Sequence, residues 1–314
     1  MKRTLKYLSL ALLAVAAVYL INLAIPRHDY FTERAGDLVA VTETTSVDDA
    51  GQQTRLHLTS SSGLTVDARI LRPATKGARL PVVLLVGGHR TGKDAVDRVG
   101  PASGTAFAAI DYPYAGNASP DGLLQSIGTL PYIQRAFIDS PPALSMVVDW
   151  LLEQPWVDPE RIELVGASLG VPFAAAAGAV DTRFSRIWLL HGGGDNVSWV
   201  AHVGRRNIEN ATLRKLAARF VLLMVHGASF DTPHWVRLSA PRPVILVAAR
   251  DDDYVPPEAQ APLVELAKEE HVELIWTEGQ HIRGDRDDEL RQLLDIVLTR
   301  VVPGPAGNTI SPGK

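Results

Sequence analysis

A serine that lies between two glycines is the first residue whose setting indicates chemistry. The stretch Gly166-Ala167-Ser168-Leu169-Gly170 follows an apolar run and precedes an Ala-rich one. A Gly-x-Ser-x-Gly sequence between a strand and a helix allows a sharp turn that exposes the serine hydroxyl. The backbone N–H of Leu169 would then lie at a helix N-terminus, where it can stabilise an oxyanion. We therefore predict that Ser168 is a nucleophile; a Gly-rich turn with a serine helix cap is the other interpretation.

A serine nucleophile needs a base, and the base needs an orienting carboxylate. Where a serine nucleophile follows a strand of a mostly parallel sheet in this way, the chain order is Ser, then Asp or Glu, then His. His281 follows the last strand that we predict, at residues 272–276, and so lies at the sheet edge where Ser168 is expected. His271 precedes that strand and lies at the other edge. The carboxylate should follow the preceding strand, after which three aspartates stand in a row: Asp251, Asp252 and Asp253. Their positions alone leave the choice among them open.

The glycines at positions 87 and 88 allow two interpretations. Residues 87–94 read Gly-Gly-His-Arg-Thr-Gly-Lys-Asp. They match the phosphate-binding pattern Gly-x4-Gly-Lys-Ser/Thr at every position except the last. Asp94 replaces the hydroxyl residue that would hold Mg²⁺, and its charge would repel phosphate. The same glycines suit an oxyanion loop, in which Gly88 or His89 supplies the second N–H. We therefore disfavour nucleotide binding.

Two further residues follow a predicted strand at the same edge of the sheet. His191 could line the pocket, but a buried histidine with satisfied hydrogen bonds is the more common case. Asp195 is a less favoured alternative to the three aspartates as the acid. The sequence shows no His/Asp/Glu cluster with metal-ligand spacing. We therefore predict neither a metal nor a cofactor.

Strands that alternate with helices are predicted to position these residues. A hairpin is expected where residues 55–58 and 64–71 flank the turn-rich stretch 59–63. Continuous apolar runs rich in β-branched residues are typical of strands buried on both faces. Such strands are predicted at 81–86, 105–110, 161–165, 186–190, 244–248 and 272–276. Helices are predicted at 142–153 and 173–180, and from about 257. Crossover connections of this kind give an α/β fold with a mostly parallel sheet and helices on both faces.

A long insertion between the later strands is predicted to form a small cap over the site. It covers about residues 196–238 and has a helical stretch near 209–225. Its aromatic residues would either line an acyl pocket or hold the cap down, and the sequence favours neither. These residues are Trp199, Phe220, Phe230 and Trp235.

The overall composition supports one large α/β domain with a short extra segment. The chain has 314 residues, of which 46% are hydrophobic and 21% charged, and such domains often reach roughly 250 residues. Its net charge is −4, which disfavours nucleic-acid binding because that needs a basic surface. Cysteine is absent, so disulfides, cysteine–zinc sites and a cysteine nucleophile are excluded.

The N-terminus has the features of a membrane anchor. Lys2, Arg3 and Lys6 precede an uncharged run over residues 7–26, and about 20 apolar residues can span a bilayer. The basic residues would keep the N-terminus in the cytoplasm and place the domain outside it. Secretion after signal cleavage is the alternative, although the run is longer than is usual for a signal peptide. We expect residues 1–26 to be the anchor, 27–50 a linker, 51–302 the α/β domain and 303–314 a flexible tail.

Taken together, these segments resemble the α/β-hydrolase family, over about residues 55–302. The resemblance is closest to its dienelactone hydrolase and acetyl-xylan esterase-like branch. The segments that carry it are the Ser168 pentapeptide, residues 81–88, Asp111-Tyr112-Pro113, residues 157–162 and Asp252-Asp253-Tyr254-Val255-Pro256. The family often has Gly-x-x-Asp-x-x-Val-Pro at the last of these, and laid on residues 249–256 this register selects Asp252.

The resemblance implies a catalytic triad. Ser168 would be the nucleophile, His281 the base and Asp252 its orienting acid, with oxyanion N–H groups from Leu169 and from Gly88 or His89. The expected activity is hydrolysis of carboxylic esters of small molecules, without a cofactor. Thioesters, lactones and amides use the same machinery, and the residues do not distinguish among them. A membrane-tethered scaffold with a hydrolase fold but no turnover is the alternative.

Overall fold

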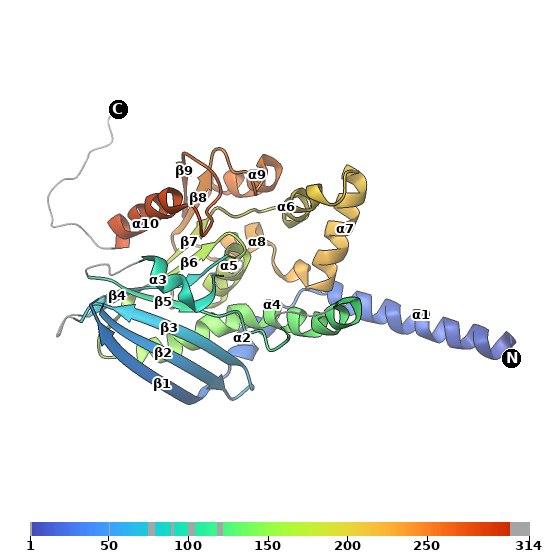
Figure 1. Ribbon diagram of the computed structural model, residues 1–314, viewed down its shortest axis with the longest axis horizontal. Coiled ribbons are helices and arrows are strands. Elements are labelled where there is room, and N and C mark those ends of the chain that lie inside the picture. Colours follow the sequence, from blue (N-terminus) through green and yellow to red (C-terminus); the bar gives the residue numbers. More distant parts are fainter. Residues whose placement is uncertain are drawn as a thin grey trace.

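The computed structural model describes residues 2–49, 51–74, 79–88, 91–99, 104–117 and 122–301, and all structural statements refer to these. They form a nine-stranded sheet with the order β1-β2-β3-β5-β4-β6-β7-β8-β9 (Figure 1). The strands are β1 (Leu38–Asp48), β2 (Gly51–Ser60), β3 (Thr65–Arg72), β4 (Leu80–Val86), β5 (Ala106–Ile110), β6 (Val157–Ala167), β7 (Arg186–Leu190), β8 (Val244–Ala249) and β9 (Val272–Thr277). The pairings β1–β2, β2–β3 and β3–β5 are antiparallel, and the remaining ones are parallel. The predicted hairpin and the mostly parallel sheet are confirmed.

Helices cover both faces of this sheet. The α-helices of the described residues are α1 (Lys2–Ala24), α2 (His28–Ala35), α3 (Val96–Val99), α4 (Gly122–Leu152), α5 (Gly170–Val180), α6 (Asn196–Val203), α7 (Ala211–Met224), α8 (Thr232–Leu238), α9 (Pro257–Leu266) and α10 (Asp287–Val301), and all but α1 lie against the body of the molecule. Side chains of β4 alternate between the two faces, as the period of a strand requires. Leu84 belongs to the core that α4, α5 and α8 complete, while Val83 belongs to the core closed by α3 and α10. Burial on both faces explains why the parallel strands read as continuous apolar runs.

Helix α4 is much longer than the helix predicted at 142–153. It begins at Gly122 and contains Pro131, Pro141 and Pro142. Proline usually ends a helix because it lacks an N–H and clashes with the preceding turn, so the sequence places a boundary there. Tertiary packing overrides this local preference, since the helix buries an apolar face that includes Leu144, Val147 and Leu151.

The segment 27–50 is not the linker that its polar composition suggested. It forms α2, which buries Phe31, and the edge strand β1, which pairs with β2 along its length. The side chains of β1 are nearly all exposed on both faces of the strand. Such a strand has no apolar–polar alternation, so pattern analysis does not detect it. The sheet domain therefore begins before residue 51.

The N-terminal helix α1 extends away from the body of the molecule (Figure 1). Most of its apolar side chains are exposed, and Leu23 is buried near its end. Within the described residues, no helix is by itself long and apolar enough to cross a membrane. The stretch Ser9–Ala24 meets that requirement only together with α2, from which it is bent by 76°. The predicted tail at 303–314 lies outside the described residues.

Candidate active site

The turn at Ser168 joins the end of β6 to the start of α5. Ser168 has a φ of 52°, a left-handed conformation that is uncommon for a residue with a side chain. The flanking glycines are needed because the backbone packs closely there. A Cβ atom on Gly166 would lie 2.5 Å from Cβ of Ala174, and one on Gly170 would lie 2.0 Å from the carbonyl oxygen of Val86. The Gly-x-Ser-x-Gly pattern is thus the sequence that this tight, strained turn requires.

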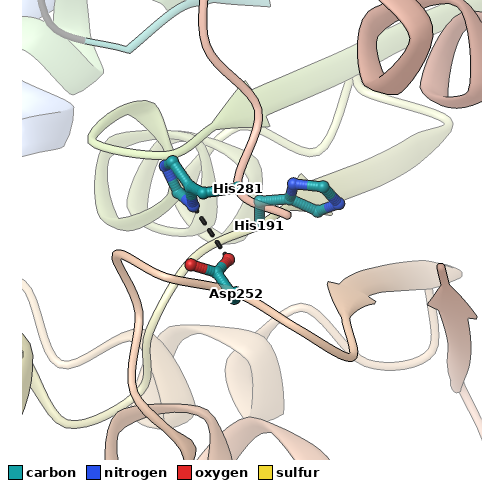
Figure 2. Close-up of side chains that lie close together, drawn as sticks. All are labelled: His191, Asp252 and His281. Carbon is teal, nitrogen blue, oxygen red and sulfur yellow. Dashed lines mark hydrogen bonds and ion pairs between the residues drawn. The ribbon is translucent and has the colours of Figure 1, made fainter. Parts of the chain in front are cut away.

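Three of the predicted site residues form one hydrogen-bonded chain. Oγ of Ser168 lies 2.8 Å from Nε2 of His281. Nδ1 of His281 lies 2.8 Å from Oδ2 of Asp252, and Figure 2 shows this second bond. The side chains of His281 and Asp252 are buried. The Nδ1–H of His281 donates to the carboxylate, which leaves Nε2 as the acceptor of the serine proton. This is the geometry of a nucleophile, a base and an orienting acid.

Only one of the candidate carboxylates contacts His281. Oδ1 of Asp252 accepts the backbone N–H groups of Tyr254 at 2.8 Å and Val255 at 2.7 Å, which turns Oδ2 toward the imidazole. Asp253 instead pairs with two arginines, Arg283 at 3.1 Å and Arg286 at 3.2 Å, and the hydrogen bond from Arg286 lowers its pKa.

The two remaining aspartates lie elsewhere. The side chain of Asp195 accepts the N–H groups of Val197 and Ser198 and so caps helix α6. Asp251 is exposed to solvent. The structure therefore brings together the combination that the family register selected, and it gives Asp195 a different contact.

The backbone that follows β4 lies close to the nucleophile. A Cβ atom on Gly88 would lie 3.3 Å from Cβ of Ser168, a tight contact that shows how closely this loop approaches the nucleophile. The hydroxyl of Tyr112 donates to the carbonyl of Gly87 at 2.6 Å and holds this loop in place. Leu169 is the N-cap residue of α5, beside the nucleophile. His89, the other predicted oxyanion residue, lies outside the described residues.

His191 lies behind the predicted base rather than in the hydrogen-bonded chain. Its Nδ1 accepts the backbone N–H of Ile282 at 2.9 Å, and its Nε2 lies 3.1 Å from Oγ1 of Thr277. Burial, together with the nearby imidazole of His281, lowers the pKa of His191 to about 4. A neutral His191 can accept this N–H, and so it fixes the backbone directly after His281. The sequence favoured a satisfied structural histidine, but the hydrogen bond to residue 282 depends on tertiary contacts and has no signal in the sequence.

His191, Asp252 and His281 also lie close enough together for metal ligation. One ligand atom from each falls within 4.8 Å of the others (Figure 2). However, all four ring nitrogens already take part in hydrogen bonds, to Ser168, Asp252, Thr277 and Ile282. A metal ion would have to replace several of these bonds. The donor set therefore suits a proton-transfer chain better than a metal centre.

A large apolar cavity surrounds the nucleophile. Its volume is about 1650 Å³, and both Ser168 and His281 line it. Ligand pockets are typically about 300–1,000 Å³, so this cavity has room for a bulky substrate. Tyr254, whose ring centroid is 5.0 Å from that of His281, and Phe137 of α4 are lining residues that the sequence did not indicate.

The cap aromatics divide between the two roles that the sequence left open. Trp199, Phe220 and Phe230 line the cavity. Trp235 is buried and packs on α2. Its ring centroid lies 4.4 Å from that of His28 and 5.7 Å from that of Phe31. The insertion therefore forms one wall of the cavity and is also held to the N-terminal segment.

Comparison with known proteins places this architecture in a fold class. No protein-family model matches the sequence, and a search of curated proteins finds no relative. The structure is similar to that of acetyl xylan esterase 1 from a Thermoanaerobacterium species, with 15% identity, coverage of 87% of this chain and 94% of that chain, and a TM-score of 0.60. An acetyl xylan esterase from a Paenibacillus species has 16% identity, coverage of 86% and 92%, and a TM-score of 0.61. A cold-adapted esterase from an Arctic intertidal metagenomic library has 16% identity, coverage of 84% and 100%, and a TM-score of 0.53.

These similarities establish the α/β-hydrolase fold for this chain, as the sequence resemblance predicted. Two of these similar structures are acetyl xylan esterases, and the third is a cold-adapted esterase.

Proposed function

We propose that this protein is a serine hydrolase that cleaves carboxylic esters. The observation that carries the proposal is the continuous chain from Ser168 through His281 to Asp252, with 2.8 Å at each step, at the wall of an apolar cavity. The esterase names of the similar structures agree with this chemistry. Thioesters and lactones remain within the same reaction class, since they are opened by the same attack on a carbonyl.

The geometry supports an acyl-enzyme mechanism. Oγ of Ser168 attacks the ester carbonyl while Nε2 of His281 takes the hydroxyl proton, and Asp252 stabilises the imidazolium that forms. The N–H of Leu169 and an N–H from the loop at Gly88 would hold the oxyanion. His281 then returns the proton to the leaving alcohol. Water releases the acyl group by the same steps, which restores Ser168.

The cavity indicates what kind of ester fits. Its lining is mainly aliphatic and aromatic, and the cap contributes Trp199, Phe220 and Phe230. Apolar surface that a substrate buries there would contribute roughly 25 cal/mol per Å² to binding. We therefore propose esters with a substantial apolar acyl or alcohol group, rather than the small acetyl group alone.

Labelling with a fluorophosphonate probe tests the proposed function. The wild-type protein should be labelled, and Ser168→Ala should lose labelling and at least about 10⁴-fold of ester turnover, because only binding and oxyanion effects remain. Ser46→Ala, on the exposed edge strand β1, is the matched control and should behave as wild type. A folded wild-type protein that is not labelled and hydrolyses no ester would support the tethered-scaffold alternative instead.

We also propose that α1 attaches the enzyme to a membrane, with the catalytic domain on the extracytoplasmic side. The exposed apolar side chains of α1 and the basic residues Lys2, Arg3 and Lys6 support this. The full chain should stay in the membrane fraction after carbonate washing, and a chain without residues 1–26 should be released and active. A mature N-terminus near residue 17 or later would show cleavage and secretion instead.

A further inference from the structure

The cap helix α7 exposes an apolar face to solvent. Leu213, Leu216, Phe220 and Val221 are 55%, 54%, 58% and 48% exposed. The first three lie three and four residues apart, a spacing that places them on one side of a helix. We call these four residues the α7 face. Apolar side chains that are exposed singly are common, but an apolar patch on one side of a helix indicates an interaction site.

The α7 face is flanked by positive charge. Lys215 and Arg219 are exposed, and neither forms an ion pair with any residue that the structure describes. The helix contains no Asp or Glu. The whole cap, residues 196–238, has six basic and two acidic residues, although the chain has a net charge of −4. A basic helix with an exposed apolar side is typical of segments that lie on anionic membrane surfaces.

The position of α7 agrees with such a surface. Helix α1 contacts α7, and Gln134 of α4 links the two, since its side chain bonds to the hydroxyl of Tyr19 at 3.0 Å and to the carbonyl of Met224 at 2.7 Å. Figure 1 shows that α7 runs across the direction of α1, on the side of the molecule from which α1 extends. A planar surface entered by α1 would therefore meet α7 along its length.

We propose that the α7 face docks on the surface of an anionic lipid bilayer. The four apolar side chains enter the acyl–headgroup boundary, while Lys215 and Arg219 contact the headgroup phosphates. Phe220 and Val221 also line the cavity, so the docked face lies at an opening that leads toward Ser168. This docking does not require that the protein hydrolyses esters, and its test does not measure turnover.

The absence of cysteine allows a direct test in the full-length chain. A single Leu216→Cys variant, labelled with a nitrobenzoxadiazole fluorophore, is reconstituted into vesicles that contain brominated acyl chains. The fluorophore should be quenched severalfold more strongly in phosphatidylglycerol vesicles than in phosphatidylcholine vesicles. The matched control is Val47→Cys, at an exposed apolar position of β1, and it should not be quenched in either.

Charge variants then test the electrostatic part of the contact. Lys215→Glu/Arg219→Glu should reduce the quenching at position 216, whereas Arg55→Glu/Lys268→Glu, which makes the same change in net charge on other elements, should not. None of these residues lines the cavity, so hydrolysis of a water-soluble ester should be unchanged in both variants. This separates a failure of docking from a failure of the proposed activity.

Three results would overturn the proposal. The first is the absence of quenching at position 216 in both kinds of vesicle. The second is equal quenching in neutral and anionic vesicles, which would remove the anionic partner. The third is efficient disulfide cross-linking between two chains of the Leu216→Cys variant without lipid quenching, which would assign the α7 face to a second copy of this chain.

Discussion

Replacing Asp252 by asparagine would reverse the proton positions on the proposed base. Oδ1 of Asp252 accepts two backbone N–H groups at 2.8 and 2.7 Å, and an asparagine in the same position would keep those bonds with its own oxygen. Its amide NH₂ would then face Nδ1 of His281 and donate to it. The imidazole would carry its proton on Nε2, which points at Ser168 and could no longer accept the serine proton.

The expected loss is about 10⁴-fold in kcat, or about 5.5 kcal/mol, the loss known for the same change in the best-studied serine protease triad. The wrong tautomer and the lost charge both contribute to it. The carboxylate and imidazole atoms are 2.8 Å apart, and unit charges centred about 4 Å apart interact by about 4 kcal/mol at an effective dielectric constant of 20. The lost charge is therefore large enough to matter beside the cost of restoring the productive tautomer.

The assay compares Asp251→Asn, Asp252→Asn and Asp253→Asn on one short-chain nitrophenyl ester, with burst titration to count active sites. Asp251 is exposed and Asp253 forms partly exposed ion pairs, so their loss should cost no more than about fivefold. If Asp252→Asn is the mildest of the three, the reasoning from the hydrogen-bonded chain is refuted. If all three are mild, the acid lies elsewhere, and Asp195 becomes the next candidate despite its role as a helix cap.

Two further predictions concern stability. The pKa of His191 is about 4 in the folded protein and about 6.5 for an ordinary, exposed histidine. Between pH 4 and 6.5 the unfolded chain therefore binds more protons than the folded protein does. His191 should therefore lower the free energy of unfolding by up to about 3 kcal/mol as the pH falls from about 6.5 to 4. Measured by urea unfolding, the stability of His191→Asn should depend less on pH than that of the wild type. Parallel plots of stability against pH for the two proteins would contradict this. Gly170→Ala should abolish or strongly destabilise the folded state, since the new Cβ would lie 2.0 Å from the carbonyl oxygen of Val86. Gly204→Ala, where nothing lies within 4 Å of the new Cβ, should leave the thermal midpoint nearly unchanged, and equal effects of the two substitutions would refute the steric argument.

The sequence could indicate Ser168 and His281 because each depends on local or topological rules. The nucleophile turn needs small residues within a pentapeptide, and the base must follow the last parallel strand, whose end meets the same edge of the sheet. Asp252 was different, since its two neighbours have the same side chain. What selects it is the direction of a carboxylate tied to the N–H groups of Tyr254 and Val255, and that geometry entered the sequence interpretation only through the family register.

The elements that the sequence missed share a physical cause. Strand β1 is exposed on both faces, so its residues have no periodicity that reflects a core. Helix α4 continues through three prolines because its apolar face packs on the sheet, a tertiary effect that local preferences cannot show. The periodicity of apolar residues in a sequence reflects which side chains are buried. It therefore reveals helices and strands that pack against the core and misses those that are mostly exposed.

The cap shows why whole-chain charge is a poor guide to surfaces. The net charge of −4 led us to disfavour a nucleic-acid partner, but this value averages an acidic body with a basic insertion. That insertion lies between β7 and β8, and it contributes the wall of the cavity as well as the exposed α7 face. If the α7 face rests on lipid and Ser168 is the nucleophile, an ester dissolved in the bilayer would pass Phe220 and Val221 to the active site without crossing bulk water. An apolar cavity much larger than an acetyl group is what such a substrate would require, so the cavity volume and the cap charge favour the same kind of substrate for different physical reasons.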